Sequence, residues 1–376
     1  MKALVVGGTG PTGPLIVQGL MDKGYEVTLY HRGHHEPANL PVVKDHKHGD
    51  PYSKETFEKD FVGESWDLVV CTYGRLRQIA DVVAGRTPKL VAAGGLPSLM
   101  RPDHLEFPQG REIPLREGHP TYFDRLLDRR GSAIAYTERQ LMAHHWAGDF
   151  GTTIFRFSAI YGPWAPRHWI GSIVKRIMDG RRQIIVPGDG SQLRLNCYAD
   201  NAANQVLLGC FKDEAMGNIF ETVDDVTFSV KDSIQLVAEA LGQEVELVGV
   251  NHPLAWKLAG GYAAGYGGGI HVSTFKQRVL LGYKDVVPPE DGIRQTAIWM
   301  RDNWEYVDEA QMLSGGRDPL DYATEDKLME SAKKWEEDVS ATLSDPELPA
   351  PPDGEWREVF KPEQKGKIMV DGNWTR

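Results

Sequence analysis

The sequence predicts an α/β fold with a doubly wound parallel sheet, and three observations support it. Short apolar runs such as residues 3–6 and 67–71 end in small residues, as buried parallel strands do. Stretches with helical periodicity separate these runs, which is typical of a parallel sheet with helices on both faces. A glycine-rich turn at residues 7–13 then joins the first predicted strand to the first predicted helix.

Each predicted element has its own local signal. The first helix follows Gly13, carries an apolar stripe that includes Leu15, Ile16 and Leu20, and ends near Gly24. After Tyr161 the alternation loosens, and the pattern predicts two further helices, one near 168–179 and an amphipathic one over 230–242. The predicted strands cover residues 3–6, 27–30, 67–71, 89–93 and 153–156.

The turn at residues 7–13 has the composition of a phosphate-binding loop. Glycines between a buried strand and a helix allow a pyrophosphate to approach the backbone and lie at the helix N-terminus. Pro11 has no amide N–H, so it removes one potential phosphate donor, and the hydroxyl or amide of Thr12 could compensate. We expect the cofactor to contact Gly7, Thr9, Gly10, Pro11, Thr12 and Gly13.

The end of the second predicted strand distinguishes between the two nicotinamide cofactors. An acidic residue there would bind the ribose 2′-OH of NAD. The chain instead reads Tyr30-His31-Arg32-Gly33, which has no carboxylate. Arg32 is available for a 2′-phosphate, although it could also be a solvated loop arginine. The sequence therefore favours NADP(H) over NAD(H).

These residues, with Arg156, Gly162-Pro163 and Tyr198-Ala199-Asp200, resemble the extended short-chain dehydrogenase/reductase superfamily of the NAD-dependent epimerase/dehydratase type. The resemblance covers about residues 1–302. It implies a Rossmann-type fold, a small organic substrate and a homodimer. His48-Gly49-Asp50 is similar to the family's adenine-contacting strand end, so the resemblance makes Asp50 a cofactor residue.

The family's catalytic Tyr-x-x-x-Lys pair is absent, because no tyrosine has a lysine four residues later. In that pair the lysine lowers the pKa of the tyrosine, so that the phenol acts as a general acid or base. Counting back from Arg156 by the family's spacing places Glu138 on a helix. The tyrosine and lysine positions then fall on Arg130 and Ile134.

Three residues are candidates for chemistry in place of that pair. Arg130 could bind an anionic substrate or an oxyanion, or belong to an exposed arginine cluster. Tyr136, in a second alignment frame with Gln140, would keep the phenol without the positive charge. Tyr73 follows the strand at 67–71, where its hydroxyl could reach the substrate or ribose, or its ring could pack over the cofactor.

The resemblance also implies a substrate pocket with aromatic and cationic side chains. Family position assigns four residues to it: Tyr122, Trp164, His168 and Trp169. Separately, five histidines occur within residues 31–48, but without a known ligand spacing such as H-E-x-x-H. We therefore expect no metal there and interpret these histidines as a solvated surface on the adenine side.

The sequence divides into three regions. We expect a dinucleotide-binding domain at 1–165, to which 196–230 return, and a smaller α+β substrate domain at 166–195 and 231–302. Residues 303–376 form a helical C-terminal extension with 18 acidic and 9 basic side chains, which gives most of the total charge of −11. Its four tryptophans predict that it packs onto the body, because disordered acidic segments are poor in aromatic residues.

Composition limits the functions that fit. The acidic balance makes a nucleic-acid partner unlikely, and no apolar run is long enough to span a membrane. Three widely spaced cysteines fit buried packing positions and a cytoplasmic location. The first hypothesis is an NADP(H)-binding oxidoreductase, or an epimerase or lyase that transiently oxidises its substrate, with a non-standard catalytic set. The alternative is a non-catalytic relative that serves as a redox sensor or binds RNA.

Overall fold

The computed structural model describes the greater part of the chain. It covers residues 1–34, 36–95, 129–165, 169–259, 261–262, 272–307, 318–343, 368–370 and 373–375. For residues 129–131 and 343 and the last two ranges it describes the backbone only.

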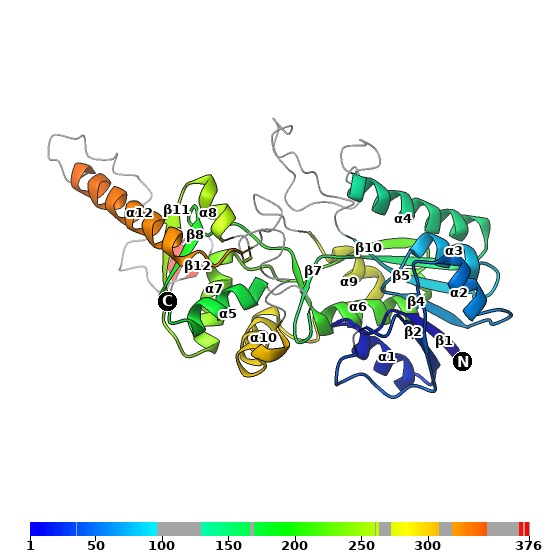
Figure 1. The fold of residues 1–376 in the computed structure, drawn as a ribbon. Coiled ribbons are helices and arrows are strands. Elements are labelled where there is room, and N and C mark those ends of the chain that lie inside the picture. Colours follow the sequence, from blue (N-terminus) through cyan, green and yellow to red (C-terminus); the bar gives the residue numbers. More distant parts are fainter. Residues whose placement is uncertain are drawn as a thin grey trace.

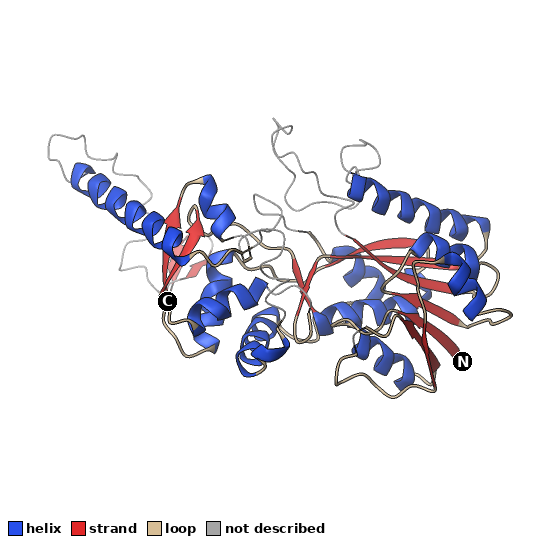
Figure 2. Cartoon of the chain, viewed as in Figure 1, coloured by secondary structure: helices blue, strands red, loops and turns tan. Residues whose placement is uncertain are grey.

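A seven-stranded parallel sheet forms the first body, as the apolar runs predict (Figures 1 and 2). Its strand order is β10-β6-β5-β4-β1-β2-β3. The chain moves outward from β1 to β3 and then returns to β4 on the other side of β1, which makes the doubly wound arrangement of a Rossmann-type fold. The strands are β1 (Lys2–Val6), β2 (Glu26–His31), β3 (Asp45–His48), β4 (Leu68–Cys71), β5 (Lys89–Gly95), β6 (Gly151–Phe157) and β10 (Asn218–Thr222).

Helices cover both faces of this sheet because its central strands are apolar on both sides. In β1, Ala3 and Val5 pack with the core that includes α1, while Leu4 and Val6 pack with the core beneath α2 and α3. Figure 1 shows α1 and α6 on one face and α2, α3 and α4 on the other. The helices are α1 (Gly13–Asp22), α2 (Lys54–Asp60), α3 (Leu76–Val83), α4 (Arg129–Ala147), α6 (Ala199–Phe211) and α9 (Phe275–Leu281).

A second, smaller body has its own hydrophobic core beside the large sheet (Figure 1). Two parallel strands pair within it, and a short parallel pair, β7 with β9, leads into it from the first body. Its strands and helices are α5 (Trp169–Met178), β8 (Gln183–Pro187), α7 (Val230–Ala240), β11 (Glu246–Val250), α8 (Pro253–Leu258) and α10 (Pro289–Asp302). The linking strands are β7 (Ala159–Tyr161) and β9 (Asn196–Tyr198).

Three short elements add to these two bodies. Two are single 3-10 turns, η4 (Asp213–Ala215) and η5 (Trp304–Tyr306). The third is an antiparallel pair near the C-terminus, β12 (Ile368–Val370) with β13 (Asn373–Thr375). Among the described residues, no helix is both long and apolar enough to cross a membrane.

The acidic C-terminal extension packs onto the second body through α12 (Tyr322–Leu343). Met329 of α12 is buried in a core with Ile185 of β8 and Val248 of β11. Trp335 lies farther along the helix and is 68% exposed, so this tryptophan does not contribute to the packing. Figure 1 shows the end of α12 projecting beyond the second body.

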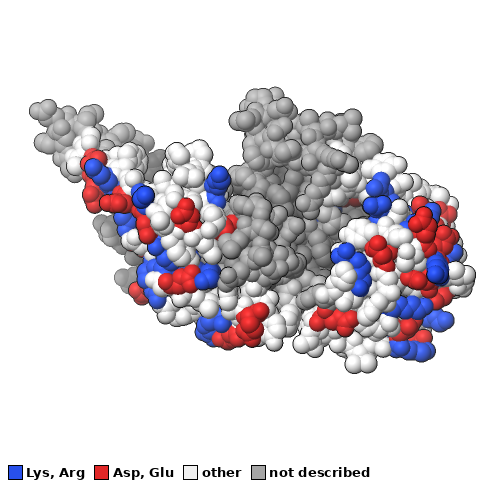
Figure 3. Space-filling model, in the orientation of Figure 1, with Lys and Arg blue, Asp and Glu red and all other residues white. Residues whose placement is uncertain are grey.

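A buried arginine fixes the start of this extension. Arg176 of α5 donates to both carboxylate oxygens of Asp318, at 2.7 and 2.9 Å, and to Glu325 at 2.5 Å. All three side chains are fully buried. Next to this network, Asp326 of α12 makes an ion pair with Arg181 at the surface. Figure 3 shows acidic and basic side chains interspersed on the displayed face of this helix.

Two adjacent acids of α12 therefore provide a matched test. Glu325→Gln removes a buried charge partner of Arg176, and we expect it to lower the free energy of unfolding by roughly 2–3 kcal/mol. Asp326→Asn breaks the exposed pair and should cost less than about 1 kcal/mol. Urea unfolding of both variants checks this, and equal effects would show that the buried network does not hold the extension.

Candidate functional site

The glycine turn between β1 and α1 depends on close backbone contacts. Gly7 has φ +101°, and a Cβ there would lie 2.5 Å from Oγ1 of Thr72, beyond the end of β4. A Cβ on Gly13 would lie 2.1 Å from the carbonyl oxygen of Gly8. The Gly8 amide also donates to Thr72 Oγ1 at 3.2 Å. These contacts explain why larger side chains cannot occupy Gly7 and Gly13.

Gly10 differs from its neighbours, because a Cβ there would meet no atom of the described residues within 4 Å. The open space lies at the N-terminus of α1, between the carboxyl ends of β1 and β4, where the direction of the strand order reverses. Dinucleotides bind at this switch point in doubly wound sheets. The glycine turn therefore fits a pyrophosphate. Pro14, which the sequence analysis did not consider, joins Pro11 in lacking an amide donor at this helix start.

Arg32 and two tyrosines form a cluster beyond the ends of β2, β3 and β4. The Arg32 guanidinium donates to the Tyr73 hydroxyl and lies 5.3 Å from the Tyr73 ring centroid and 5.9 Å from that of Tyr52. The two rings are 5.2 Å apart and meet edge to face. Arg32 is thus held by aromatic partners beside the glycine turn, and Tyr73 directs its hydroxyl to this group. Asp50 lies in the turn that follows β3, where its carboxylate accepts a hydrogen bond of 3.0 Å from the Tyr52 amide.

A second arginine fixes α4 against the sheet. Arg156 of β6 donates two hydrogen bonds of 2.8 Å to Glu138 of α4 and one of 2.8 Å to Glu221 of β10. The three residues are buried. This pair matches the alignment frame in which Glu138 is the helix glutamate. Eight residues along a helix correspond to two full turns and a further rotation of about 80°, so the backbone position of Arg130 lies within a quarter turn of Glu138 on α4. Its side chain is outside the described residues.

Tyr136 lies on another side of α4. Its ring is 42% exposed, and the guanidinium of Arg77 on α3 lies 5.3 Å from the ring centroid. Two residues along a helix correspond to a rotation of about 200°, so Tyr136 and Glu138 point in nearly opposite directions. The structure therefore separates Tyr136 from the face that carries Glu138.

Sequence reasoning missed two hydroxyls at the carboxyl edge of the sheet. Ser158 follows β6, and Thr222 ends β10; the Ser158 amide donates to the Thr222 carbonyl at 3.2 Å. Their side-chain oxygens are buried and have no hydrogen-bond partner among the described residues. Buried polar groups are normally paired, which suggests that a ligand or water binds here. The neighbouring β5 ends in Gly94 and Gly95, which offer no hydroxyl.

Of the four aromatic pocket candidates, the structure describes Trp164 and Trp169, and the two lie in different surroundings. Trp169 is 4% exposed and belongs to the core of the second body. Trp164 has φ +64° and contacts the rings of Trp299 and Tyr306, whose centroids lie 5.2 and 5.3 Å away. Tyr122 and His168 lie outside the described residues. Only Trp164 is thus placed where α10 and the short turn η5 meet the linker between the two bodies.

The histidine-rich segment differs from the expected solvated surface. His31 is 3% exposed and packs against the rings of His46 and His48. Glu36 joins them, and one ligand atom from each of the four side chains lies within 4.8 Å of the others. His34, His46 and His48 are exposed, as that interpretation expects, whereas the burial of His31 and the convergence of the rings follow from strand pairing, which spacing along the chain does not show. The three cysteines are buried, as expected.

Asp224 is a buried carboxylate just beyond β10. It accepts hydrogen bonds from the Tyr198 amide and Asn201 at 2.9 Å and from the Tyr161 hydroxyl at 3.0 Å. Burial raises its pKa from 3.8 to about 7, because removal from water penalises the charged form more than these bonds stabilise it. It thus titrates close to neutral pH.

Comparison with known proteins supports the fold and finds a family match for part of the chain. Residues 131–219 match the model of the "NAD dependent epimerase/dehydratase family". One curated relative, the uncharacterized protein y4nL of Sinorhizobium fredii, is 27% identical over 191 residues. That match spans 45% of this chain and only 53% of the relative, so the two proteins are compared over about half their lengths.

Solved structures with the same fold cover most of the chain. UDP-glucose 4-epimerase from Thermotoga maritima, solved with UDP-glucose, has a TM-score of 0.65 and 18% identity over 81% of this chain and 100% of that one. The dTDP-glucose 4,6-dehydratase of Bacillus anthracis, in complex with NAD, has a TM-score of 0.63 and 15% identity over 82% and 98%. At these identities the likeness establishes the Rossmann-type fold.

The titration of Asp224 predicts a pH-dependent stability. The folded chain keeps this proton up to about pH 7, while the unfolded chain releases it near pH 4, so stability falls as the pH rises between these values. The steepest slope is about 1.4 kcal/mol per pH unit. Asp224→Asn removes this contribution and keeps one oxygen acceptor. In thermal melts from pH 4 to 8, the melting temperature of the variant should rise relative to that of the wild type as the pH rises. Parallel profiles of the two proteins would contradict the raised pKa of Asp224.

Proposed function

We infer the function from two findings: residues 131–219 match the model of the NAD dependent epimerase/dehydratase family, and the chain has a Rossmann-type fold. From this premise we propose that the protein is an NADP(H)-binding oxidoreductase, or an epimerase or lyase that transiently oxidises a small organic substrate. The coarser assignment, a nucleotide-cofactor oxidoreductase or epimerase-like function, has the support of the family match and the fold. The choice of NADP(H) and the catalytic set are proposals.

Arg32 is the observation that carries the cofactor proposal. It occupies the position after β2 where an NAD-binding chain has a carboxylate, and Tyr73 and Tyr52 hold its guanidinium beside the glycine turn. A planar guanidinium binds phosphate through paired charge-assisted hydrogen bonds. Because the solved B. anthracis dehydratase is in complex with NAD, the preference for NADP(H) rests on Arg32 and on no relative.

The residues present fit a dinucleotide along the carboxyl edge of the sheet. The open space over Gly10 takes the pyrophosphate, and the buried hydroxyls of Ser158 and Thr222 offer hydrogen bonds at the other end of that edge. When bound, the nicotinamide would supply hydride donor or acceptor chemistry. The chain itself would orient the substrate and exchange a proton with it.

The sequence has no Tyr-x-x-x-Lys pair to transfer the proton, and the geometry of α4 bears on which residue could replace it. The backbone position of Arg130 lies within a quarter turn of Glu138, so we propose that it binds an anionic substrate group or stabilises an oxyanion. Tyr136 faces α3 and Arg77, which disfavours a catalytic role. Tyr73 is bound to Arg32 and is better explained as a cofactor residue.

A non-catalytic redox sensor is the second candidate. The observation that favours it is the loss of both expected groups near the substrate end: β5 ends in Gly94-Gly95 without a hydroxyl, and α4 has no Tyr-x-x-x-Lys pair. Such a protein would bind NADP and NADPH with clearly different affinities and would transfer no hydride to any substrate. An RNA-binding role lacks comparable support.

Cofactor choice can be measured by titrating the protein's tryptophan fluorescence with NADPH and NADH. We expect the wild type to bind NADPH more tightly than NADH. Arg32→Ala should weaken the affinity for NADPH about 10- to 100-fold, because charged hydrogen bonds are lost, and leave the affinity for NADH nearly unchanged. Arg77→Ala is the matched control, because it removes another arginine stacked on a tyrosine. Tighter binding of NADH than of NADPH by the wild type would contradict the NADP assignment.

Catalysis can be tested by single-turnover absorbance of NADPH with sugar nucleotides and simple ketones. Arg130→Ala should slow hydride transfer about 100-fold or more, as removal of an oxyanion donor does, with NADPH affinity unchanged. Tyr136→Phe should behave like the wild type. Absence of any spectral change over the whole panel, with intact cofactor binding, would favour the sensor.

A further inference from the structure

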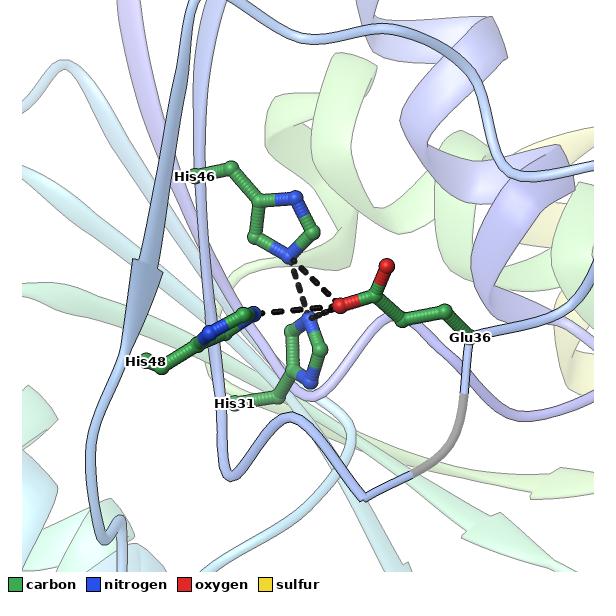
Figure 4. A group of neighbouring side chains, drawn as sticks. All are labelled: His31, Glu36, His46 and His48. Carbon is green, nitrogen blue, oxygen red and sulfur yellow. Dashed lines mark hydrogen bonds and ion pairs between the residues drawn. The ribbon is translucent and has the colours of Figure 1, made fainter.

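Three histidines and one glutamate converge at the edge of the large sheet (Figure 4). His46 and His48 are two residues apart in β3, so both side chains project from the same face of the strand. The parallel register pairs His31, the last residue of β2, with His48. Glu36 reaches the group from the connection between β2 and β3. Strand pairing, and not sequence spacing, therefore assembles this cluster.

The distances within the cluster approach those of a metal centre. Oε1 of Glu36 lies 3.1 Å from Nε2 of His48 and 3.7 Å from Nε2 of both His31 and His46. Ligands about 2.1 Å from a tetrahedral Zn²⁺ lie about 3.4 Å apart. The three contacts of Glu36 bracket this value. The Nε2 atoms of His31 and His46, at 2.5 Å, would separate by about 0.9 Å on binding.

We propose that His31, Glu36, His46 and His48 form a binding site for one Zn²⁺ ion. Three imidazoles and one carboxylate are typical ligands of zinc and related first-row metals, whereas Mg²⁺ and Ca²⁺ take oxygen ligands. Four protein ligands would fill a tetrahedral shell and leave no open position, as in structural sites. The site lies outside the proposed catalytic region.

Binding requires one local change at His31. The Gly33 amide donates to Nδ1 of His31 at 3.0 Å, so that nitrogen carries the lone pair. An imidazole that binds a metal through Nε2 has its proton on Nδ1 and donates from it. The Gly33 hydrogen bond would be lost, and a single neutral hydrogen bond contributes little net stability. The binding free energy of a structural zinc site is much larger and outweighs that loss.

The surroundings allow an ion to enter and give it a role. The side chains of His48 and Glu36 are 55% and 44% exposed, so solvent reaches the cluster. A cavity of about 350 Å³ adjoins it, lined in part by Leu40, Val43 and His46. Among the described residues, β3 pairs only with β2. A metal bridging β3, β2 and their connection would therefore fasten the edge strand and the loop that begins at Arg32.

Calorimetric titration of the full chain, first stripped with EDTA, tests this site with ZnCl₂ as the only added ligand. We expect one Zn²⁺ per chain, a Kd below about 1 µM, and a higher melting temperature when zinc is present. His46→Ala and His48→Ala should each weaken binding on the order of 100-fold. His34→Ala is the matched control, since His34 lies on the same connection outside the cluster.

Two outcomes would overturn the proposal. One is a wild-type Kd above about 100 µM; the other is unchanged affinity in the His46→Ala/His48→Ala double variant. His48→Gln, at an exposed position, guards against loss of folding in the alanine variants and should also lose zinc. Retained NADPH binding in the stripped protein keeps this test separate from that of the cofactor.

Discussion

The geometry of the candidate site depends on the buried ion pairs of Arg156. They tie α4 and β10 to β6 and thereby fix the rotation of α4 about its axis. That rotation decides which helical positions face the carboxyl edge of the sheet, and it separates Arg130 from Tyr136. A buried arginine that loses a partner is costly, so this geometry is held firmly. In the second body, buried ion pairs of Arg176 with Asp318 and Glu325 hold the acidic extension in the same way.

The other residues of the candidate site lie along the carboxyl edge of the sheet. Parallel strands end on the same side, so residues far apart in the sequence meet there: the glycine turn after β1, Arg32 after β2, Tyr73 after β4 and Ser158 after β6. The polar groups follow a fixed order along this edge. The Arg32 guanidinium and two phenols lie near one end, and near the other lie two hydroxyls that have no hydrogen-bond partner in the described part of the chain. An extended ligand with a phosphate at one end matches this order.

Sequence reasoning succeeded where the signal is local. The apolar strands and the glycine turn follow from periodicity and composition, because each depends on neighbouring residues. The family resemblance placed Glu138 on a helix but did not predict its ion pair with Arg156. It could not find the Arg176–Asp318 pair, whose members are 142 residues apart. It also missed the His31 cluster, which requires the register of β2 against β3, and the open hydroxyls of Ser158 and Thr222, which require burial to be known.

The central claim is that this edge binds NADP(H) with its 2′-phosphate on Arg32. The most direct measurement is a crystal structure of the full chain with NADPH. The account predicts the pyrophosphate over Gly10, the 2′-phosphate within hydrogen-bonding distance of the Arg32 guanidinium, and the nicotinamide toward Ser158. A bound NADPH whose 2′-phosphate points away from Arg32, or no cofactor at saturating NADPH, would contradict it.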